Sequence, residues 1–172
     1  MGLNVQDLDE SLARWQAAGV PVAHSGAPFP QAWVETPGGL LIEILQTPDQ
    51  EHPIQHHHVH YYVPEADIPV AQQWYAEVFE VVPGMRGRFD AADIPGANLT
   101  FSAADGELDG TRGRVLDHVG FEVEDLGAFC RRVEERSDVE LDRPCERDPI
   151  TGQMRAYLYD PWGTYLAVTE RP

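Results

Sequence analysis

The sequence predicts an α+β protein built from three copies of one strand–helix–strand unit, and two observations support that prediction. The stretch 57–63 (HHVHYYV) recurs 60 positions later at 117–123 (DHVGFEV), with a histidine at the second position of both copies. A shortened copy opens the chain, where residues 2–8 (GLNVQDL) match residues 120–126 (GFEVEDL). Repeats of this kind indicate supersecondary units that bury their apolar faces against one another.

The first unit, residues 1–50, is expected to be a truncated module. Residues 2–6 read as the end of a strand, and Asp7 is a good N-cap for a helix with apolar residues at i, i+4 and i+7. Strands are expected at 32–35 and 40–45, on either side of a Thr-Pro-Gly-Gly turn. Because the unit lacks the start of its first strand, we expect a longer natural protein of four modules. We also expect the first unit to pack on its own copy or on the other two units.

The second and third units repeat the scheme at full length. In the second unit, residues 51–113, a strand, a helix and two strands are expected at 57–63, 68–79, 85–92 and 97–103. In the third unit, residues 114–172, Asp125 is expected to cap the helix. Its strands are expected at 116–123, 154–159 and 164–169, with an irregular stretch at 137–153. A lone unit would expose an open sheet, so the complete lengths favour pairing of the second unit with the third.

Composition narrows the range of partners. The formal net charge is −17, and all twelve basic residues are arginines. Nucleic acids and anionic membrane surfaces attract basic patches, so neither is expected as a partner. No apolar run approaches the roughly 20 residues of a membrane span and no signal peptide is recognised, so a cytoplasmic location is the default. Cys130 and Cys145 do not make a disulfide framework, and Cys130 is expected to be a small core residue.

Four motifs of the repeat resemble those of a known superfamily. They are LDHVGFEVEDL at 116–126, HHVHYYV at 57–63, YDPWGTYLAV at 159–168 and TPGGLLIEIL at 36–45. With them the chain resembles the vicinal oxygen chelate superfamily, which includes glyoxalases, extradiol ring-cleaving dioxygenases and the bleomycin and fosfomycin resistance proteins. The motifs span nearly the whole chain and are specific for the superfamily, but they do not identify a substrate. The resemblance implies βαβββ modules, two complete ones forming a cup-shaped mixed sheet around a divalent metal.

The resemblance also implies a set of ligand positions. In this superfamily histidines come from the first strands, and carboxylates come from the last strands, four residues after the turn glycine. Carried over, the histidine positions are His58 and His118, and the carboxylate positions are Glu43, Thr100 and Ala167. A pair of the second and third modules would hold both histidines but no carboxylate. Iron and manganese favour two histidines with one carboxylate.

Three routes could complete the ligand set. His60 lies two residues after His58 and faces the same side of the strand, so it is a candidate third ligand or acid–base catalyst. Glu170 follows Ala167 by three residues and would need a bulge to reach the cup. Glu43 could enter through another pairing of modules, such as a subunit exchange; otherwise it is expected to be solvated or at a dimer interface.

Aromatic side chains complete the predicted pocket. We expect Tyr62 and Tyr157 to line the cup together with Thr100 and Ala167. Tyr165 is also expected to face the cup, and its hydroxyl is a candidate for proton transfer.

Two main functions remain open. One is a metal-dependent dioxygenase, lyase or isomerase that uses iron, manganese, zinc or nickel as a Lewis acid on a small aromatic diol or 2-oxo compound. The other is a non-catalytic, drug-sequestering protein with an aromatic pocket and no metal. A purely structural domain is a third possibility. The superfamily resemblance favours the enzyme, and a homodimer that binds a small molecule is expected.

Overall fold

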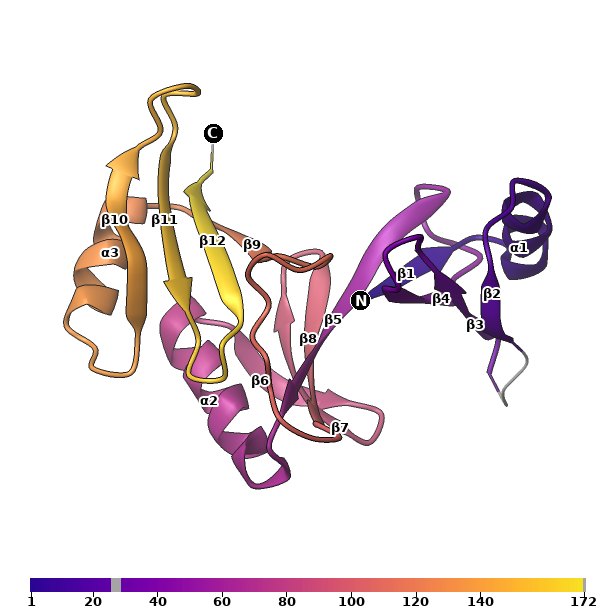
Figure 1. Ribbon diagram of the computed structural model, residues 1–172, viewed down its shortest axis with the longest axis horizontal. Coiled ribbons are helices and arrows are strands. Elements are labelled where there is room, and N and C mark those ends of the chain that lie inside the picture. The colour runs from indigo at the N-terminus through magenta and orange to yellow at the C-terminus, as the bar shows by residue number, and fades with distance from the viewer. Residues whose placement is uncertain (26–28, 172) are drawn as a thin grey trace. The chain divides into compact units, whose positions relative to one another are not determined.

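The structure of the protein is a computed structural model that describes residues 1–25 and 29–171. It separates into two compact units, Met1–Asp105 and Gly106–Pro172, which are described one at a time (Figure 1). Mixed sheets and a few helices make up both units, which confirms the predicted α+β class.

The first unit contains the first two modules in a single mixed sheet. The first module contributes β1 (Gly2–Val5), α1 (Leu8–Ala17), β2 (Val22–Ser25), β3 (Gln31–Glu35) and β4 (Leu41–Gln46). The second contributes β5 (Ile54–Val63), a short 3-10 helix (Glu65–Asp67), α2 (Ile68–Phe79), β6 (Val82–Arg86), β7 (Phe89–Ile94) and β8 (Ala97–Ala103). The strand order is β2-β3-β4-β1-β5-β8-β7-β6. In Figure 1, β5 is the long magenta strand that joins the two modules.

The centre of this sheet is the seam between β1 and β5, the first strands of the two modules, which run antiparallel. On its other side each strand pairs in parallel with the last strand of its own module, β1 with β4 and β5 with β8. The sheet therefore joins the first module to the second, whereas we expected the second to pair with the third. The four residues of β1 are enough to bond both neighbours. How the third module lies beside the second stays a prediction.

Both helices of the first unit follow the sequence pattern. Asp7 caps α1 as predicted, because its carboxylate accepts the Glu10 N–H at 2.8 Å. The apolar side of α1 packs on the core of the first module, made of Val5, Leu8, Ala32, Val34 and Ile44. The bounds of α2 are those predicted, and α2 packs against β6, β7 and β8.

One predicted strand of the second module is in fact a hairpin. The stretch 85–92 crosses from β6 into β7, and Gly87 turns the chain with φ 61°. β6 is an edge strand whose residues are almost all exposed, so it lacks the alternation of apolar residues by which strands are recognised.

The second unit consists of the third module. It contains β9 (Val119–Val123), α3 (Leu126–Glu134), β10 (Glu140–Arg147), β11 (Met154–Tyr159) and β12 (Tyr165–Glu170), with the strand order β10-β11-β12-β9. β10 lies where an irregular stretch was expected. Its sequence, ELDRPCER, is mostly charged and contains a proline, so it gives no strand signal.

The strand register confirms that the three modules are equivalent. In each module, the residue four positions after the turn glycine pairs with the same position of the first strand. These pairs are Glu43 with Gly2, Thr100 with His60, and Ala167 with Gly120. The ligand positions that the resemblance implied therefore lie in corresponding places of the three modules.

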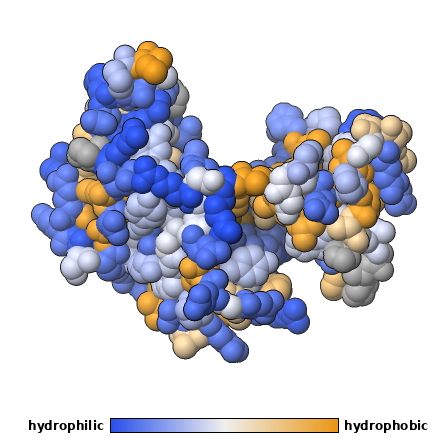
Figure 2. Space-filling view, viewed as in Figure 1, coloured by the Kyte–Doolittle hydropathy of each residue, from blue (hydrophilic) through white to orange (hydrophobic). Residues whose placement is uncertain are grey.

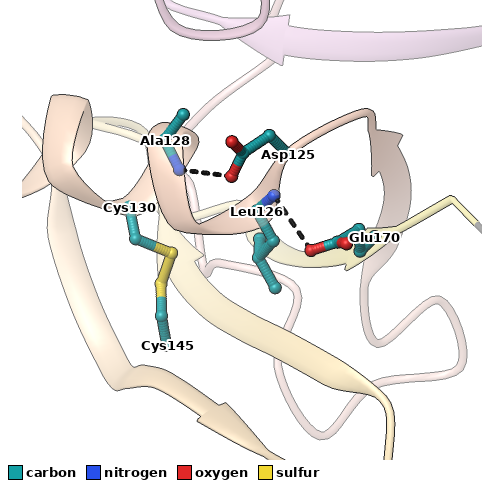
Figure 3. Close-up of a disulfide and its surroundings, with 6 residues drawn as sticks. All are labelled: Asp125, Leu126, Ala128, Cys130, Cys145 and Glu170. Atoms are coloured by element: carbon teal, nitrogen blue, oxygen red, sulfur yellow. Dashed lines mark hydrogen bonds between the residues drawn. A yellow bond between two sulfur atoms is a disulfide. The ribbon is translucent and has the colours of Figure 1, made fainter.

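A disulfide between Cys130 and Cys145 ties α3 to β10, with 6.2 Å between the Cα atoms (Figure 3). Cys130 is buried, as expected of a core residue, but the cross-link was not expected. Figure 3 also shows Asp125 accepting the Ala128 N–H at 2.7 Å, which confirms the predicted cap. Glu170 accepts the Leu126 N–H at 3.3 Å, so its side chain supports the helix rather than the ligand face.

The face of the molecule seen in Figure 2 is largely hydrophilic. Figure 2 shows hydrophilic residues over most of the visible face, with apolar residues scattered among them. Among the helices that the structure describes, none is long and apolar enough to cross a membrane.

Candidate metal centre

Glu43, His58 and His60 come together on one face of the eight-stranded sheet. The register places Glu43 of β4 and His58 of β5 on either side of Gly2 in β1. Because Gly2 has no side chain, the His58 ring lies over it, and a Cβ atom at this position would collide with the Cε1 and Nδ1 atoms of His58. The two side chains therefore meet across a strand that would otherwise separate them.

The three side chains present their ligand atoms to one point. His58 Nε2 lies 3.0 Å and His60 Nε2 lies 3.8 Å from the same oxygen, Glu43 Oε2. All three ligand atoms fall within 4.8 Å of one another. The side chains of His58, Glu43 and His60 are 0%, 8% and 10% exposed. Two imidazoles and one carboxylate in a shielded position form a donor set typical of divalent transition metals.

The Nε2 atom of His58 lacks a hydrogen-bond partner among the described residues, although it is buried. It is close to Glu43, but the contact does not have hydrogen-bond geometry. On the other side of the ring, His58 Nδ1 lies 2.7 Å from His57 Nδ1, so one of these two nitrogens carries a shared proton. With that proton on His58, Nε2 presents a lone pair to a carboxylate. A cation between them would satisfy both groups, so the residues fit a metal.

A β-bulge brings His57 to this place. Gly2 pairs with His58 and the next residue of β1 pairs with His56, so His57 is the extra residue of the bulge. Strict alternation predicts that His57 faces away from His58. The bulge overturns that prediction, and the His57 ring lies edge-on to the His58 ring at 4.9 Å.

An arginine flanks the cluster on the side of the second module. Arg86 Nε donates to Thr100 Oγ1 at 2.9 Å, and its Nη2 donates to His60 Nε2 at 3.0 Å. Because a guanidinium only donates, His60 Nε2 accepts, and the ring proton lies on Nδ1, which is 3.3 Å from Ser102 Oγ. Thr100 stands at the carboxylate position of its module. A hydroxyl and an arginine therefore stand at the position of a second acidic ligand, and a metal bound to His60 Nε2 would displace the hydrogen bond from Arg86.

The surroundings of Glu43 and His58 shift their pKa values toward the protonation states that bind a cation. Burial acts to raise the pKa of Glu43, but the contacts with His58 and His60 and the charge of Arg86 outweigh burial and hold this pKa well below its usual value. Burial lowers the pKa of His58 to about 4, although the nearby carboxylate acts in the opposite direction. At neutral pH the carboxylate is ionised and the imidazole is neutral, which are the protonation states that bind metals.

The cluster opens into a cup of about 1020 Å³ within the first unit. Both modules contribute apolar side chains to its lining, namely Phe29, Trp33, Leu45, Tyr62 and Phe89. The Tyr62 ring stacks on the His60 ring with centroids 5.8 Å apart. Of the predicted pocket residues, Tyr62 lines this cup, and Thr100 lies beside it through its bond to Arg86.

The remaining predicted site residues lie in the second unit. Tyr157 and Tyr165 stack with centroids 5.5 Å apart, and the ring of His118 lies 6.4 Å from Tyr165. His118 Nδ1 bonds to Asp117 at 2.8 Å. Ala167 of β12 pairs with Tyr157 of β11. A metal shared by His58 and His118 stays a prediction.

Tyr165 is held as a neutral phenol. Its hydroxyl donates to Asp142 Oδ2 at 2.9 Å. Burial and the Asp142 carboxylate raise the pKa of Tyr165 to about 12, so at neutral pH it can donate a hydrogen bond but cannot act as a base.

From the sequence, His118 was favoured over Glu43 as a ligand, and Glu43 was expected to be solvated or at a dimer interface. Two signals pointed to Glu43. Of the three positions four residues after the equivalent turn glycines, it is the one that carries an acid, and Gly2 in a strand indicates close approach of another group. The bulge at His57 has no comparable signal.

Comparisons with known proteins agree with this architecture. A family model described as the Glyoxalase/Bleomycin resistance protein/Dioxygenase superfamily matches residues 1–168. Among solved structures, glyoxalase I from Zea mays matches with a TM-score of 0.72 and 14% identity, and a mutant of it with 0.76 and 13%. Both alignments cover 98% of this chain and 66% of the maize chain, so the chain spans just under two thirds of that protein. TioX from Micromonospora sp. matches with a TM-score of 0.54 and 18% identity, over 68% of this chain and 98% of its own. These likenesses show the fold. No curated protein matches the sequence.

Proposed function

Because the chain belongs to the glyoxalase/bleomycin resistance protein/dioxygenase superfamily, we propose that it is a metal-dependent enzyme whose centre is Glu43, His58 and His60. One observation carries the proposal: the buried Nε2 of His58 lacks a hydrogen-bond partner and lies beside an ionised carboxylate. Two imidazoles and one carboxylate suit iron and manganese, and also bind zinc or nickel.

Glu43, His58 and His60 would hold a divalent metal, which when bound would supply a Lewis acid for the vicinal oxygens of a small aromatic or 2-oxo substrate. The chain itself binds and orients that substrate. Tyr62 and Phe89 offer aromatic faces, and the walls of the cup exclude water from part of the bound molecule. His60 stands next to the same space, so it is a candidate to move a proton where its Nε2 does not serve as a ligand.

Metal content tests the proposal. We expect protein grown with iron, manganese, zinc and nickel to retain one metal ion per chain, measured by elemental analysis after desalting. Glu43→Gln keeps the shape of the side chain but removes its charge, so we expect it to weaken metal binding by at least tenfold. His58→Ala should abolish binding.

Glu35→Gln is the matched control, because Glu35 is an exposed acid of the neighbouring strand β3. It should bind metal as the unchanged protein does. Circular dichroism of each variant separates loss of a ligand from loss of the fold. Full metal occupancy in folded His58→Ala would end the assignment.

The predicted pairing of the second and third modules implies that different variants lose the metal. In that arrangement His58 and His118 share the metal, so His118→Ala should release it while Glu43→Gln should not. The Glu43 centre predicts the reverse, and the two variants assayed together decide between the arrangements.

A second candidate function is metal-free binding of a small molecule, as in a sequestering protein. The specific observation that favours it is Arg86, whose guanidinium already supplies a positive charge to His60. If the protein takes up none of the four metals, this alternative replaces the enzyme. The homodimer and the cytoplasmic location also stay proposals, for which light scattering and cell fractionation are the measurements.

A further inference from the structure

The lining of the cup differs in charge from the rest of the chain. The protein carries a formal net charge of −17, yet two of its twelve basic residues, Arg86 and Arg88, line this one cup. Among the described residues of the lining, Glu43 is the one acid, and it already faces two imidazoles. The negative charge of the whole protein repels anions. A cationic pocket attracts anionic ligands and raises their concentration locally.

A tight turn holds the two arginines together. β6 and β7 are joined through Gly87 and Arg88, with Arg86 paired to Phe89 across the turn. Gly87 has φ 61°, a conformation that favours glycine at the first central position of a two-residue hairpin. The turn therefore presents two guanidinium groups beside one aromatic ring.

Neither arginine has an acidic partner within ion-pair distance in the described part of the chain. The hydrogen bonds of Arg86 go to Thr100 and His60, which are neutral groups. Both guanidinium carbons lie near the Phe89 ring, that of Arg86 at 5.8 Å and that of Arg88 at 5.1 Å from its centroid. A guanidinium without an acidic partner has donors to spare for an oxyanion, and its fork matches the two oxygens of a carboxylate.

Flat apolar surfaces surround these charges. Phe89, Tyr62 and Trp33 all line the cup, and aromatic rings of this kind bind planar molecules by stacking. Arg86 also touches His60, so an anion held by Arg86 lies next to the metal cluster.

We propose that Arg86 and Arg88 form an anion subsite that holds the carboxylate of a small planar substrate. The substrate class of the cup is then a hydroxylated aromatic carboxylate, with its vicinal oxygens at the cluster and its carboxylate on the arginines. This inference rests on the proposed function, because both place a substrate in the same cup.

A matched pair of ligands tests the subsite: 2,3-dihydroxybenzoate and catechol differ only by the carboxylate. Binding is followed by quenching of tryptophan fluorescence, since Trp33 lines the cup, and by calorimetry. We expect the unchanged protein to bind 2,3-dihydroxybenzoate at least tenfold more tightly than catechol. In Arg88→Gln the preference should fall to less than about threefold.

Arg14→Gln is the matched control, because Arg14 is an exposed arginine of α1 and does not line the cup. It makes the same change of charge and should leave the preference unchanged. Equal affinity for the two ligands in the unchanged protein overturns the proposal, as does an unchanged preference in Arg88→Gln. Failure of 2,3-dihydroxybenzoate to bind at millimolar concentration also overturns it. Phenyl phosphate is a third test ligand. If it binds more tightly than 2,3-dihydroxybenzoate, the carboxylate assignment is wrong and the subsite holds a phosphate.

The same titrations on chelator-treated protein separate this inference from the proposed metal centre. A carboxylate preference that persists without metal, and that Arg88→Gln removes, supports the subsite even if His58→Ala shows that no metal binds there. Metal binding without any carboxylate preference leaves the metal centre standing and removes the subsite.

Discussion

Gly2 sets the position of the His58 ring, although it contributes no ligand atom. The ring occupies the space that a side chain at position 2 would need. His58 is fully buried, so its imidazole could move away only by displacing neighbouring groups. The geometry of the centre therefore depends on the absence of a methyl group in β1.

We predict that Gly2→Ala weakens metal binding by about 10- to 100-fold, the range found when a group that orients a metal ligand is lost. The measurement is metal affinity by calorimetry, with circular dichroism as the test of folding. Gly120→Ala is the matched control, because Gly120 is the equivalent glycine of β9 and has open space around its Cα. Unchanged affinity in Gly2→Ala would mean that His58 does not bind the metal in the orientation seen here.

At this scale the sequence predicted some residues of the site and not others. The superfamily resemblance implied His58 and the position of Glu43, and the strand pattern added His60 because it faces the same side as His58. Their meeting depends on which module pairs with which, and no local pattern encodes that choice. The contact of His57 with His58 depends on a bulge, which arises from strand register and not from composition.

In the second unit a disulfide cross-links two elements of secondary structure. It joins α3 to β10 across 15 positions of sequence, and closing a loop of this length removes conformational freedom from the unfolded chain. On the sheet side, β10 is an edge strand with a bulged register, so it is bonded to one neighbouring strand, β11, and the disulfide adds a second attachment.

We predict that Cys145→Ala lowers the free energy of unfolding of the second unit by about 3 kcal/mol. Urea unfolding with and without dithiothreitol measures it. The reductant should lower the stability of the unchanged protein by a similar amount and should not affect the variant. No response of the unchanged protein to the reductant would show that the thiols are free, as expected of a protein kept in a reducing cytoplasm.

Among the helices and strands, the predictions succeeded where one buried face imposes a regular spacing on the apolar residues. They failed where no face is buried in this way. α2 has the bounds that its apolar stripe predicted, and Asp7 and Asp125 cap their helices. By contrast β6 and β10 are edge strands that contain a proline and lack a regular alternation of apolar residues, and they were merged with a neighbour or missed. An edge strand is held by backbone bonds on one side, so its side chains need not alternate.

On the scale of the whole molecule, the repeat predicted three modules but not their arrangement. Each module has the same bare sheet edge at its first strand, so the sequence alone allows the first strand of any module to pair with that of another. In the first unit this edge is satisfied by the pairing of β1 with β5, while β9 bonds to β12 alone among the described strands. The two sheets share no strand, and each compact unit contains one of them.

This separation predicts two unfolding transitions, and it predicts which ligand acts on which. A metal that binds only the native first unit stabilises that unit by RT ln(1 + [L]/Kd), about 2.7 kcal/mol at a concentration of 100 Kd. We therefore expect saturating metal to raise the melting temperature of the Met1–Asp105 transition and to leave the other unchanged. Dithiothreitol should do the opposite, lowering only the transition of the unit that contains the Cys130–Cys145 bond. Differential scanning calorimetry with each addition, and with both, makes the assignment. A single transition that both additions shift would show that the two units unfold cooperatively, and would favour a shared interface between the second and third modules.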